Sequence, residues 1–351
     1  MNQNQPYWKR HWKSLLNIVV LAALLAVIIA LRSQLLATIH NLAHVHAWVL
    51  LAIIPLEVWN YDAQTRLYRG LFEVVGNKLS YKFLFKAALE LNFINSVFPS
   101  GGVSGISYFG ARMRNDQISG GKATAVQLFK LLLLYLSFEV LLIIGLFFLA
   151  LSGHVNGFVI LVATAISTLL VVGTFAFILI IGSRRRINAT FSFITRALNG
   201  VIKLFRPSHK AAINIESVRH VVDELHDNYK LIHSNYRKLK NPFVQALAAN
   251  LSEVLAAYIV YVAFGHFINF GAIILAYAVA NFAGLVSVLP GGIGIFEALM
   301  TAVLAVAGVP LSLSIPATIM YRIINMIFQL PPGYYFYHRG LQQDRLGSGA
   351  S

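Results

Sequence analysis

Several charged side chains lie inside long apolar stretches of this 351-residue sequence. A charge within hydrocarbon is costly, so by default such a residue belongs to a binding site or a translocation path. The charged residues are Glu57, Glu90, Glu139, Glu253, Glu297, Lys130 and Arg322, and the same stretches hold Asn92, Asn95, Asn250, Asn281 and Asn325.

The two cations suggest the kind of substrate. Lys130 and Arg322 each lie in the apolar segment that follows a proline-glycine break, and an anion that crosses hydrocarbon needs cationic partners on its route. The acidic residues would neutralise these cations in the empty site, or carry protons. The alternative is structural, a buried pair such as Lys130 with Glu139 that only fixes helix packing.

Two breaks interrupt the apolar segments in matching ways. Broken backbone survives in hydrocarbon only where protein buries it or a water-filled cavity solvates it. One such break in each half of a chain points to a translocation site, and a half-helix starting at Gly102 or Gly292 would suit a phosphate. The alternative is a kink packed against its neighbours. The breaks read SVFPSGGVSG at 96–105, with Pro99, Gly101 and Gly102, and SVLPGGIG at 287–294, with Pro290, Gly291, Gly292 and Gly294.

Helices that span a membrane must position these residues. The chain is 58% hydrophobic and 12% charged, whereas a soluble domain has about 25% charged residues. We therefore predict an all-α polytopic membrane protein with about six spanning helices and two re-entrant segments, forming one transmembrane domain over residues 1–346. The spans are expected at 15–31, 47–61 (extending to 71), 123–151, 157–181, 242–267 and 311–337, and the broken segments at 82–109 and 271–307.

Lysine and arginine indicate the orientation, because cytoplasmic loops hold the excess of both. With the N-terminus inside and both breaks re-entrant, Arg32 is the only basic residue left outside, apart from Lys130 and Arg322 within spans. A full crossing of the first broken segment would move Arg112, Arg114 and Lys122 outside. The favoured arrangement places both termini in the cytoplasm and predicts an inverted-topology repeat of residues 47–151 and 241–338.

A polar cytoplasmic segment, residues 183–240, separates the two halves. Its first part has an apolar stripe flanked by basic residues, which is typical of a helix lying in the membrane interface. After Pro207 the apolar residues have helical spacing, which predicts a helix packed on its neighbour or a short coiled-coil seam. The tail at 347–351 resembles a linker.

Composition and missing motifs limit the chemistry. The chain has no cysteine, which excludes disulfides and thiolates. Its net charge of +15 would suggest nucleic acid in a soluble protein, but basic residues beside the spans favour anionic lipid head groups instead. His40, His44 and His46 lack a carboxylate or cysteine partner, so interfacial histidines are favoured over a metal site. No zinc-protease helix motif, P-loop or nucleophile elbow occurs, so we expect no enzyme activity and no cofactor.

The two break motifs, with Leu-Pro-Gly-Gly-Ile-Gly-Ile-Phe-Glu-Ala in the second, resemble the flippase-like transmembrane domain of lysylphosphatidylglycerol synthases. The resemblance covers about residues 15–337. Its further matches are Tyr61-Asp62, the basic pair Arg112 and Arg114, Ser252-Glu253, and Glu297. In two-domain members this domain is thought to move aminoacylated lipid made by a soluble synthase domain. The resemblance therefore implies lipid movement by a stand-alone relative.

The leading hypothesis is a lipid translocase of the bacterial cytoplasmic membrane, whose head-group path is a polar cavity between the repeats. The alternatives are an ion- or proton-coupled transporter of a small anionic solute, a membrane-embedded enzyme acting on lipid-linked substrates, and a non-transporting scaffold. The expected partner is a membrane phospholipid, with a separate lipid-modifying enzyme and a second copy of the chain as further candidates, and no nucleic acid. The expected substrate-binding residues are Asp62, Arg112, Arg114, Lys130, Glu253, Glu297 and Arg322.

Overall fold

The structure is a computed structural model that describes residues 29, 32–33, 36, 45–98, 103–114, 116–151, 157–190, 192–193, 215–286 and 292–347. Nearly all of the expected span at 15–31 lies outside these ranges. So do His40, His44, Pro99, Gly101, Gly102, Pro290 and Gly291. Every regular element within the described ranges is helical, which confirms the predicted all-α class.

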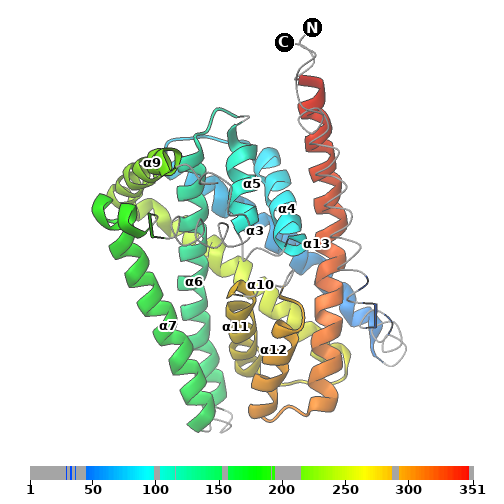
Figure 1. The fold of residues 1–351 in the computed structure, drawn as a ribbon. Coiled ribbons are helices and arrows are strands. Elements are labelled where there is room, and N and C mark those ends of the chain that lie inside the picture. Colours follow the sequence, from blue (N-terminus) through cyan, green and yellow to red (C-terminus); the bar gives the residue numbers. More distant parts are fainter. Residues whose placement is uncertain are drawn as a thin grey trace, which may run out of the picture.

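The described helices and their arrangement are drawn in Figure 1. In chain order they are η1 (Ala47–Ala52), α3 (Ile53–Val74), α4 (Tyr81–Val97), α5 (Val103–Arg114), α6 (Gly120–Leu151), α7 (Gly157–Ile181), α9 (Ile215–Ser234), η2 (Tyr236–Leu239), α10 (Lys240–Ala263), α11 (Phe270–Val286), α12 (Ile295–Val306) and α13 (Leu311–Gly347).

Four stretches in the described ranges are long and apolar enough to cross a membrane: Gly120–Leu151, Ile160–Ile181, Tyr236–Ala263 and Leu311–Gly340. The shortest has 22 residues, and a helix needs about 20 to span the hydrocarbon core. The expected span at 47–61 corresponds to η1 and the start of α3. The polytopic fold is confirmed, while the number of about six spans stays a prediction.

The two broken segments form helical pairs of matching length. α4 and α11 each have 17 residues, and α5 and α12 each have 12. At about 1.5 Å per residue these helices are roughly 25 Å and 18 Å long, shorter than the core of about 30 Å. The α4–α5 pair lies in one half of the molecule and the α11–α12 pair in the other (Figure 1). The inverted repeat remains a prediction.

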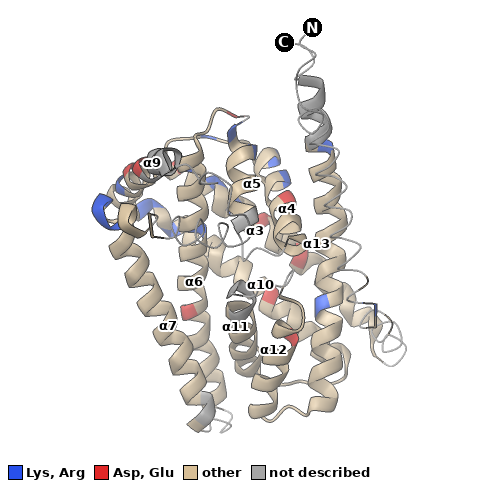
Figure 2. Ribbon diagram, viewed as in Figure 1, with Lys and Arg blue, Asp and Glu red and all other residues tan. Residues whose placement is uncertain are grey.

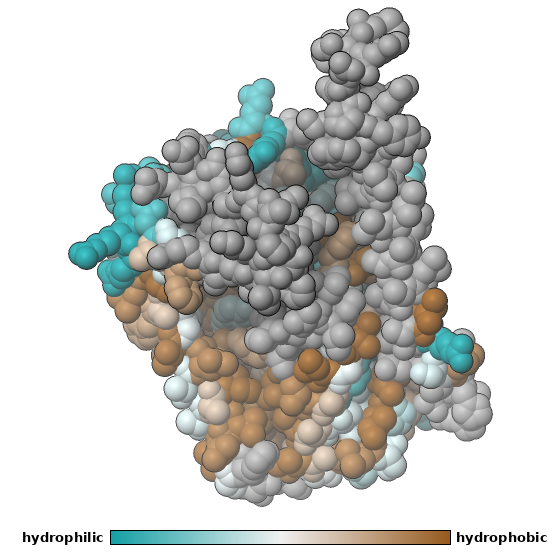
Figure 3. Space-filling model, viewed as in Figure 1, coloured by the Kyte–Doolittle hydropathy of each residue, from teal (hydrophilic) through white to brown (hydrophobic). Residues whose placement is uncertain are grey.

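Two apolar cores hold the helices together. One joins α10, α11, α12 and α13 with parts of α6 and α7, and the other joins α3, α4, α5, α6 and α9. Large apolar side chains of α7, among them Leu161, Leu169 and Phe175, remain exposed. Among the described residues that Figure 3 colours, hydrophobic ones dominate the lower part of the molecule, away from the α9 end. These exposed side chains are suited to contact lipid.

Basic residues are concentrated at one end of the molecule. No lysine or arginine occurs between Lys130 and Arg184, or between Lys240 and Arg322. These intervals contain the α6–α7, α10–α11 and α12–α13 connections. Lysine and arginine gather instead around α9 and the adjacent helix ends (Figure 2). This one-sided distribution is what the positive-inside rule requires.

α9 packs on α6. The sequence had offered this packing as one of two interpretations of the apolar spacing after Pro207. Leu225 and Ile232 are buried in the core shared with α6, and Tyr229 stacks on Phe129 with ring centroids 6.2 Å apart. Arg184 also donates a hydrogen bond of 2.7 Å to Asp227, and this bond holds the pKa of Asp227 below its ordinary value. Most of the expected interface helix at 183–206 lies outside the described residues.

Sidedness can be tested with single cysteines, since the chain has none. We expect Ser119→Cys and Lys238→Cys to react with an impermeant thiol reagent from one side of a sealed vesicle, and His266→Cys and Ser312→Cys from the other. All four positions are exposed. Labelling of position 119 from the same side as position 266 would contradict a re-entrant first broken segment.

Candidate functional site

A polar cavity of about 240 Å³ lies where the two halves of the chain meet. Residues beside both breaks line it, since Asn95 and Ser96 precede the first and Phe296 follows the second. The prediction that the breaks flank a common site is therefore consistent with the structure. The full lining is Gln64, Asn92, Asn95, Ser96, Glu253, Tyr277, Asn281, Phe296, Tyr321, Arg322, Asn325 and Gln329.

Glu297 ties the second break to the cavity. One carboxylate oxygen accepts a 2.7 Å hydrogen bond from the Gly294 N–H at the start of α12, where φ is +86° and glycine is favoured. The other accepts a 3.2 Å bond from Nε of Arg322 on α13. The Arg322 guanidinium also lies 4.6 Å from the Phe296 ring centre. Both charged side chains are largely buried, with exposures of 15% and 11%.

Glu253 on α10 is the most heavily hydrogen-bonded carboxylate at the cavity. Its Oε2 accepts bonds from the Tyr321 hydroxyl at 2.7 Å, Asn325 Nδ2 at 3.1 Å and the Tyr277 hydroxyl at 3.4 Å. Donors from α11 and α13 therefore converge on one oxygen, and such convergence stabilises a negative charge. Sequence reasoning identified Glu253 but missed both tyrosines.

α3 contributes a polar stripe at helical spacing. Glu57, Asn60 and Gln64 fall on one face, and Asn60 Nδ2 donates to Ala249 O at 2.9 Å and to Ser252 Oγ at 3.0 Å on α10. Glu57 is 4% exposed, and its Oε1 accepts a 3.3 Å bond from Asn325. This stripe joins α3 to both α10 and α13 at the level of the cavity.

Lys130 on α6 is bound by neutral groups. Its Nζ donates to Gln64 Oε1 at 3.1 Å and to the Tyr68 hydroxyl at 3.0 Å, and lies 4.4 Å from the Tyr68 ring centre. The suggested pairing of Lys130 with Glu139 is wrong, because nine positions along one helix separate them by about 13 Å. Through Gln64, Lys130 lies one hydrogen bond from the lining of the polar cavity.

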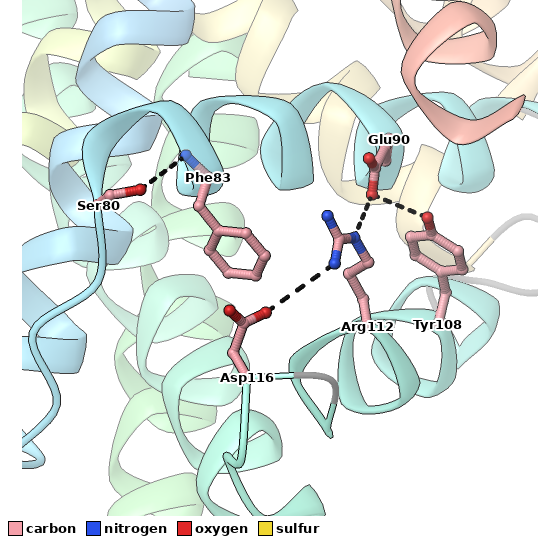
Figure 4. A network of polar contacts seen from close by, with 6 residues as sticks. All are labelled: Ser80, Phe83, Glu90, Tyr108, Arg112 and Asp116. Carbon is pink, nitrogen blue, oxygen red and sulfur yellow. Dashed lines mark hydrogen bonds and ion pairs between the residues drawn. The ribbon is translucent and has the colours of Figure 1, made fainter. Parts of the chain in front are cut away.

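Arg112 lies in a separate basic cavity of about 300 Å³ between α4, α5 and α13. Its Nε donates to Glu90 Oε2 at 3.1 Å, and the Tyr108 hydroxyl donates to the same oxygen at 2.8 Å (Figure 4). Asp116 lies 4.0 Å from the guanidinium. Lys82, Lys86 and Arg339 also line the cavity, so cations outnumber the one carboxylate there.

An aromatic cluster lies at the α4–α13 interface. Phe93 on α4 contacts Tyr334 and Tyr337 on α13, with ring centroids 5.8 and 5.7 Å apart. Tyr108 packs on Tyr337 at 5.8 Å. α13 approaches α4 closely here, because a Cβ on Gly333 would lie 2.8 Å from Leu89 O.

Two further expected site residues, Asp62 and Arg114, line neither the polar nor the basic cavity. Asp62 pairs with the exposed Arg66 at 2.7 Å and accepts a 2.8 Å bond from the Tyr81 hydroxyl. Arg114 is exposed at the end of α5. Sequence reasoning had missed Gln64 and Gln329, although each lies one helical turn from an asparagine, Asn60 or Asn325, and that spacing was the available signal. No group of three or more metal-ligating side chains occurs among the described residues.

The family described as lysylphosphatidylglycerol synthase TM region matches residues 14–333. Two curated relatives, each described as a UPF0104 membrane protein of Methanothermobacter thermautotrophicus, are similar over shorter stretches. One is 37% identical over 97 residues, 28% of this chain and 29% of the relative. The other is 28% identical over 137 residues, 38% of this chain and 39% of the relative. The matched stretches thus span less than half of each relative's length.

The Arg322–Glu297 pair should contribute to stability because removing one partner leaves a buried charge. We expect Glu297→Gln to lower the free energy of unfolding by about 3–5 kcal/mol. The matched control is Glu73→Gln, which breaks an exposed pair with Arg69 and should change it by less than about 1 kcal/mol. The measurement is denaturant unfolding in detergent micelles. Additive effects of Glu297→Gln and Arg322→Gln in the double variant would contradict a direct pair.

Proposed function

The chain belongs to the family of lysylphosphatidylglycerol synthase transmembrane regions, and from this membership and the cavity geometry we propose that it moves a phospholipid between membrane leaflets. The head group, anionic or aminoacylated, passes through the polar cavity while the acyl chains stay in the bilayer. The chain makes and breaks no covalent bond in this process, and its partner is the membrane phospholipid. It acts in a cytoplasmic membrane with both termini on the cytoplasmic side.

The charges at the polar cavity suit a lipid head group. The Arg322 guanidinium can bind a phosphate through its planar array of N–H donors, and Lys130 lies close behind Gln64. Glu253 and Glu297 can bind an ammonium group of an aminoacyl or amine head group. A cavity with both signs of charge can therefore hold a head group that carries both.

A neighbouring apolar cavity is the observation that carries the lipid proposal. This cavity, of about 340 Å³, lies among α6, α7 and α11 and is lined mainly by leucine and aromatic side chains. Phe282 lines it, while the preceding residue, Asn281, lines the polar cavity. A polar and an apolar cavity on adjoining residues of one helix match the two parts of a phospholipid. A small solute would need only the polar one.

The basic cavity around Arg112 extends the proposed route to the α9 end of the molecule. Four cationic side chains there surround one buried carboxylate, which would attract a phosphate from the cytoplasmic leaflet. In the proposed cycle the head group passes from this cavity to the polar one along α4 and α13, which contribute residues to both.

Removing the charges should stop transport without unfolding the chain. We expect Arg322→Gln, Lys130→Gln and Glu297→Gln each to reduce flipping at least about tenfold, equivalent to about 1.4 kcal/mol in the barrier. The assay follows a head-group-labelled phospholipid in proteoliposomes at matched amounts of folded protein. Arg69→Gln, at an exposed pair on α3, should flip normally. Undiminished flipping in all three variants would contradict this site.

Filling the apolar cavity should test whether that cavity holds an acyl chain. Gly173 lines that cavity, and a Cβ added there would meet nothing within 4 Å. We expect Gly173→Leu to slow lipid flipping severalfold because the new side chain occupies the space of an acyl chain. Gly157→Leu is the matched control, since Gly157 lies on the same helix with equally open space and outside the cavity. Equal flipping by the two variants would contradict a role of the apolar cavity in lipid passage.

A further inference from the structure

Two carboxylates on different helices lie beside one amide at the centre of the molecule. Asn325 Nδ2 donates to Glu253 Oε2 at 3.1 Å and to Glu57 Oε1 at 3.3 Å. The distance between the two carboxylate oxygens is therefore at most the sum of these two hydrogen-bond lengths. Glu57 is 4% exposed. Like charges this close in a low-dielectric site strongly disfavour double ionisation.

The surroundings of the two carboxylates differ sharply. Glu253 Oε2 accepts from Tyr321, Asn325 and Tyr277, and Arg322 lies near enough to act on its charge. Glu57 has the single 3.3 Å contact to Asn325. Its Oε2 is buried without a hydrogen-bond partner among the described residues. When environments differ in this way, the poorly solvated carboxyl is the one that holds a proton.

Tyr61 is a second buried polar residue close to Glu57. Tyr61 lies one turn beyond Glu57 on α3 and is 6% exposed. Its hydroxyl has no partner of ordinary hydrogen-bond geometry among the described residues, although it lies near enough to sense the charges of Glu57 and Glu253. The Tyr61 hydroxyl has only a contact to Asn92 outside ordinary geometry, and Glu57 Oε2 has no partner among the described residues, so an exchangeable ligand fits beside Glu57.

The ligand that fits is a proton. A metal cation would need oxygen ligands, but Asn325 turns its N–H groups toward both carboxylates. Its Oδ1 faces the other way, where it accepts from Gln329. Tyr321 and Tyr277 likewise present hydroxyl donors to Glu253. N–H and O–H donors repel a metal ion, whereas they tolerate a carboxyl group that gains or loses a proton.

The other ionisable groups around Glu57 leave it without a countercharge of its own. Arg322 is bound to Glu297, and Lys130 is bound to Gln64 and Tyr68 further along α3. On α4, Glu90 is bound to Arg112 and Tyr108, and η1 has no ionisable residue. The groups that face Glu57 are Glu253 on α10, Tyr277 on α11, Tyr321 on α13 and Tyr61 on its own helix.

We propose that Glu57 and Glu253 form a proton-binding site in which Glu57 carries the proton, and that this proton is the coupling ion for transport. The inference rests on the proposed function. The proton comes from water in the polar cavity, which Glu253 lines, and forms an O–H bond on Glu57. It is returned to water when the cavity opens to the other side. A phosphate that draws Arg322 away from Glu297 leaves the acidic groups less neutralised, so head-group binding and proton binding favour each other.

The proton site can be tested without transport, by infrared spectroscopy of the purified chain in lipid. We expect a protonated-carboxyl C=O band at neutral pH that shifts in deuterated water. It should disappear in Glu57→Gln and persist in the control Glu73→Gln, whose carboxylate is exposed and paired with Arg69. Survival of the band in a folded Glu57→Gln, or its absence from the wild type, would overturn the assignment.

Coupling is tested by the distribution of a head-group-labelled phospholipid between leaflets under an imposed pH gradient. One proton per lipid shifts that distribution about tenfold per pH unit. Glu57→Gln should show no shift, and the wild-type arm decides the question even if that variant does not fold. A wild-type distribution that ignores the pH gradient, or follows a sodium gradient instead, overturns the coupling.

The two hypotheses fail in distinguishable ways. Absent flipping with the infrared band present rejects the lipid function and leaves the proton site. Flipping without the band and without a gradient effect rejects the proton inference and leaves the lipid function.

Discussion

Every backbone N–H and C=O group within hydrocarbon needs a partner inside the protein, and the central features of this structure depend on that constraint. Unbroken helices satisfy it internally, whereas a broken helix must find other donors and acceptors. At the second break, Glu297 supplies an acceptor for the Gly294 N–H and, with its other oxygen, pairs with Arg322. One side chain thus stabilises the broken backbone and compensates a buried cation. The two contacts of Glu297 therefore stabilise both the second break and the charged side chain at the cavity.

The polar cavity persists because each helix contributes polar groups to it at helical spacing. Glu57, Asn60 and Gln64 on α3 face Ser252 and Glu253 on α10 and Asn325 on α13. These polar contacts connect both halves of the chain in addition to the apolar core that α6 shares with α10–α13. Burial makes each such hydrogen bond stronger, and an unpaired member more costly. An unpaired oxygen on Glu57 in this setting is therefore notable, and that cost is why we assign it a proton.

Sequence patterns were sufficient to predict the all-α polytopic class, because apolar length and the charge distribution report directly on the bilayer. They also identified Arg322, Glu297 and Glu253, because an intramembrane charge is rare enough to be conspicuous. The partners were not predictable. Lys130 is bound by Gln64 and Tyr68, which do not stand out in the sequence. Tyr277 and Tyr321 look like apolar packing residues in the sequence, and only the fold brings their hydroxyl groups to Glu253. Asp62 and Arg112 were grouped with the central site by motif alone, whereas helix geometry places them elsewhere.

Two arginines have almost the same surroundings at different positions in the fold. Nε of Arg112 donates to Glu90 at 3.1 Å, with the guanidinium 4.8 Å from the Phe83 ring centre. Nε of Arg322 donates to Glu297 at 3.2 Å, with the guanidinium 4.6 Å from the Phe296 ring centre. A bare guanidinium in a low-dielectric cavity would hold a phosphate too tightly to release it. A resident carboxylate that competes for the same donors weakens that binding, and passage requires sites that bind a substrate without trapping it. The paired carboxylates are therefore as necessary to a head-group path as the arginines they neutralise.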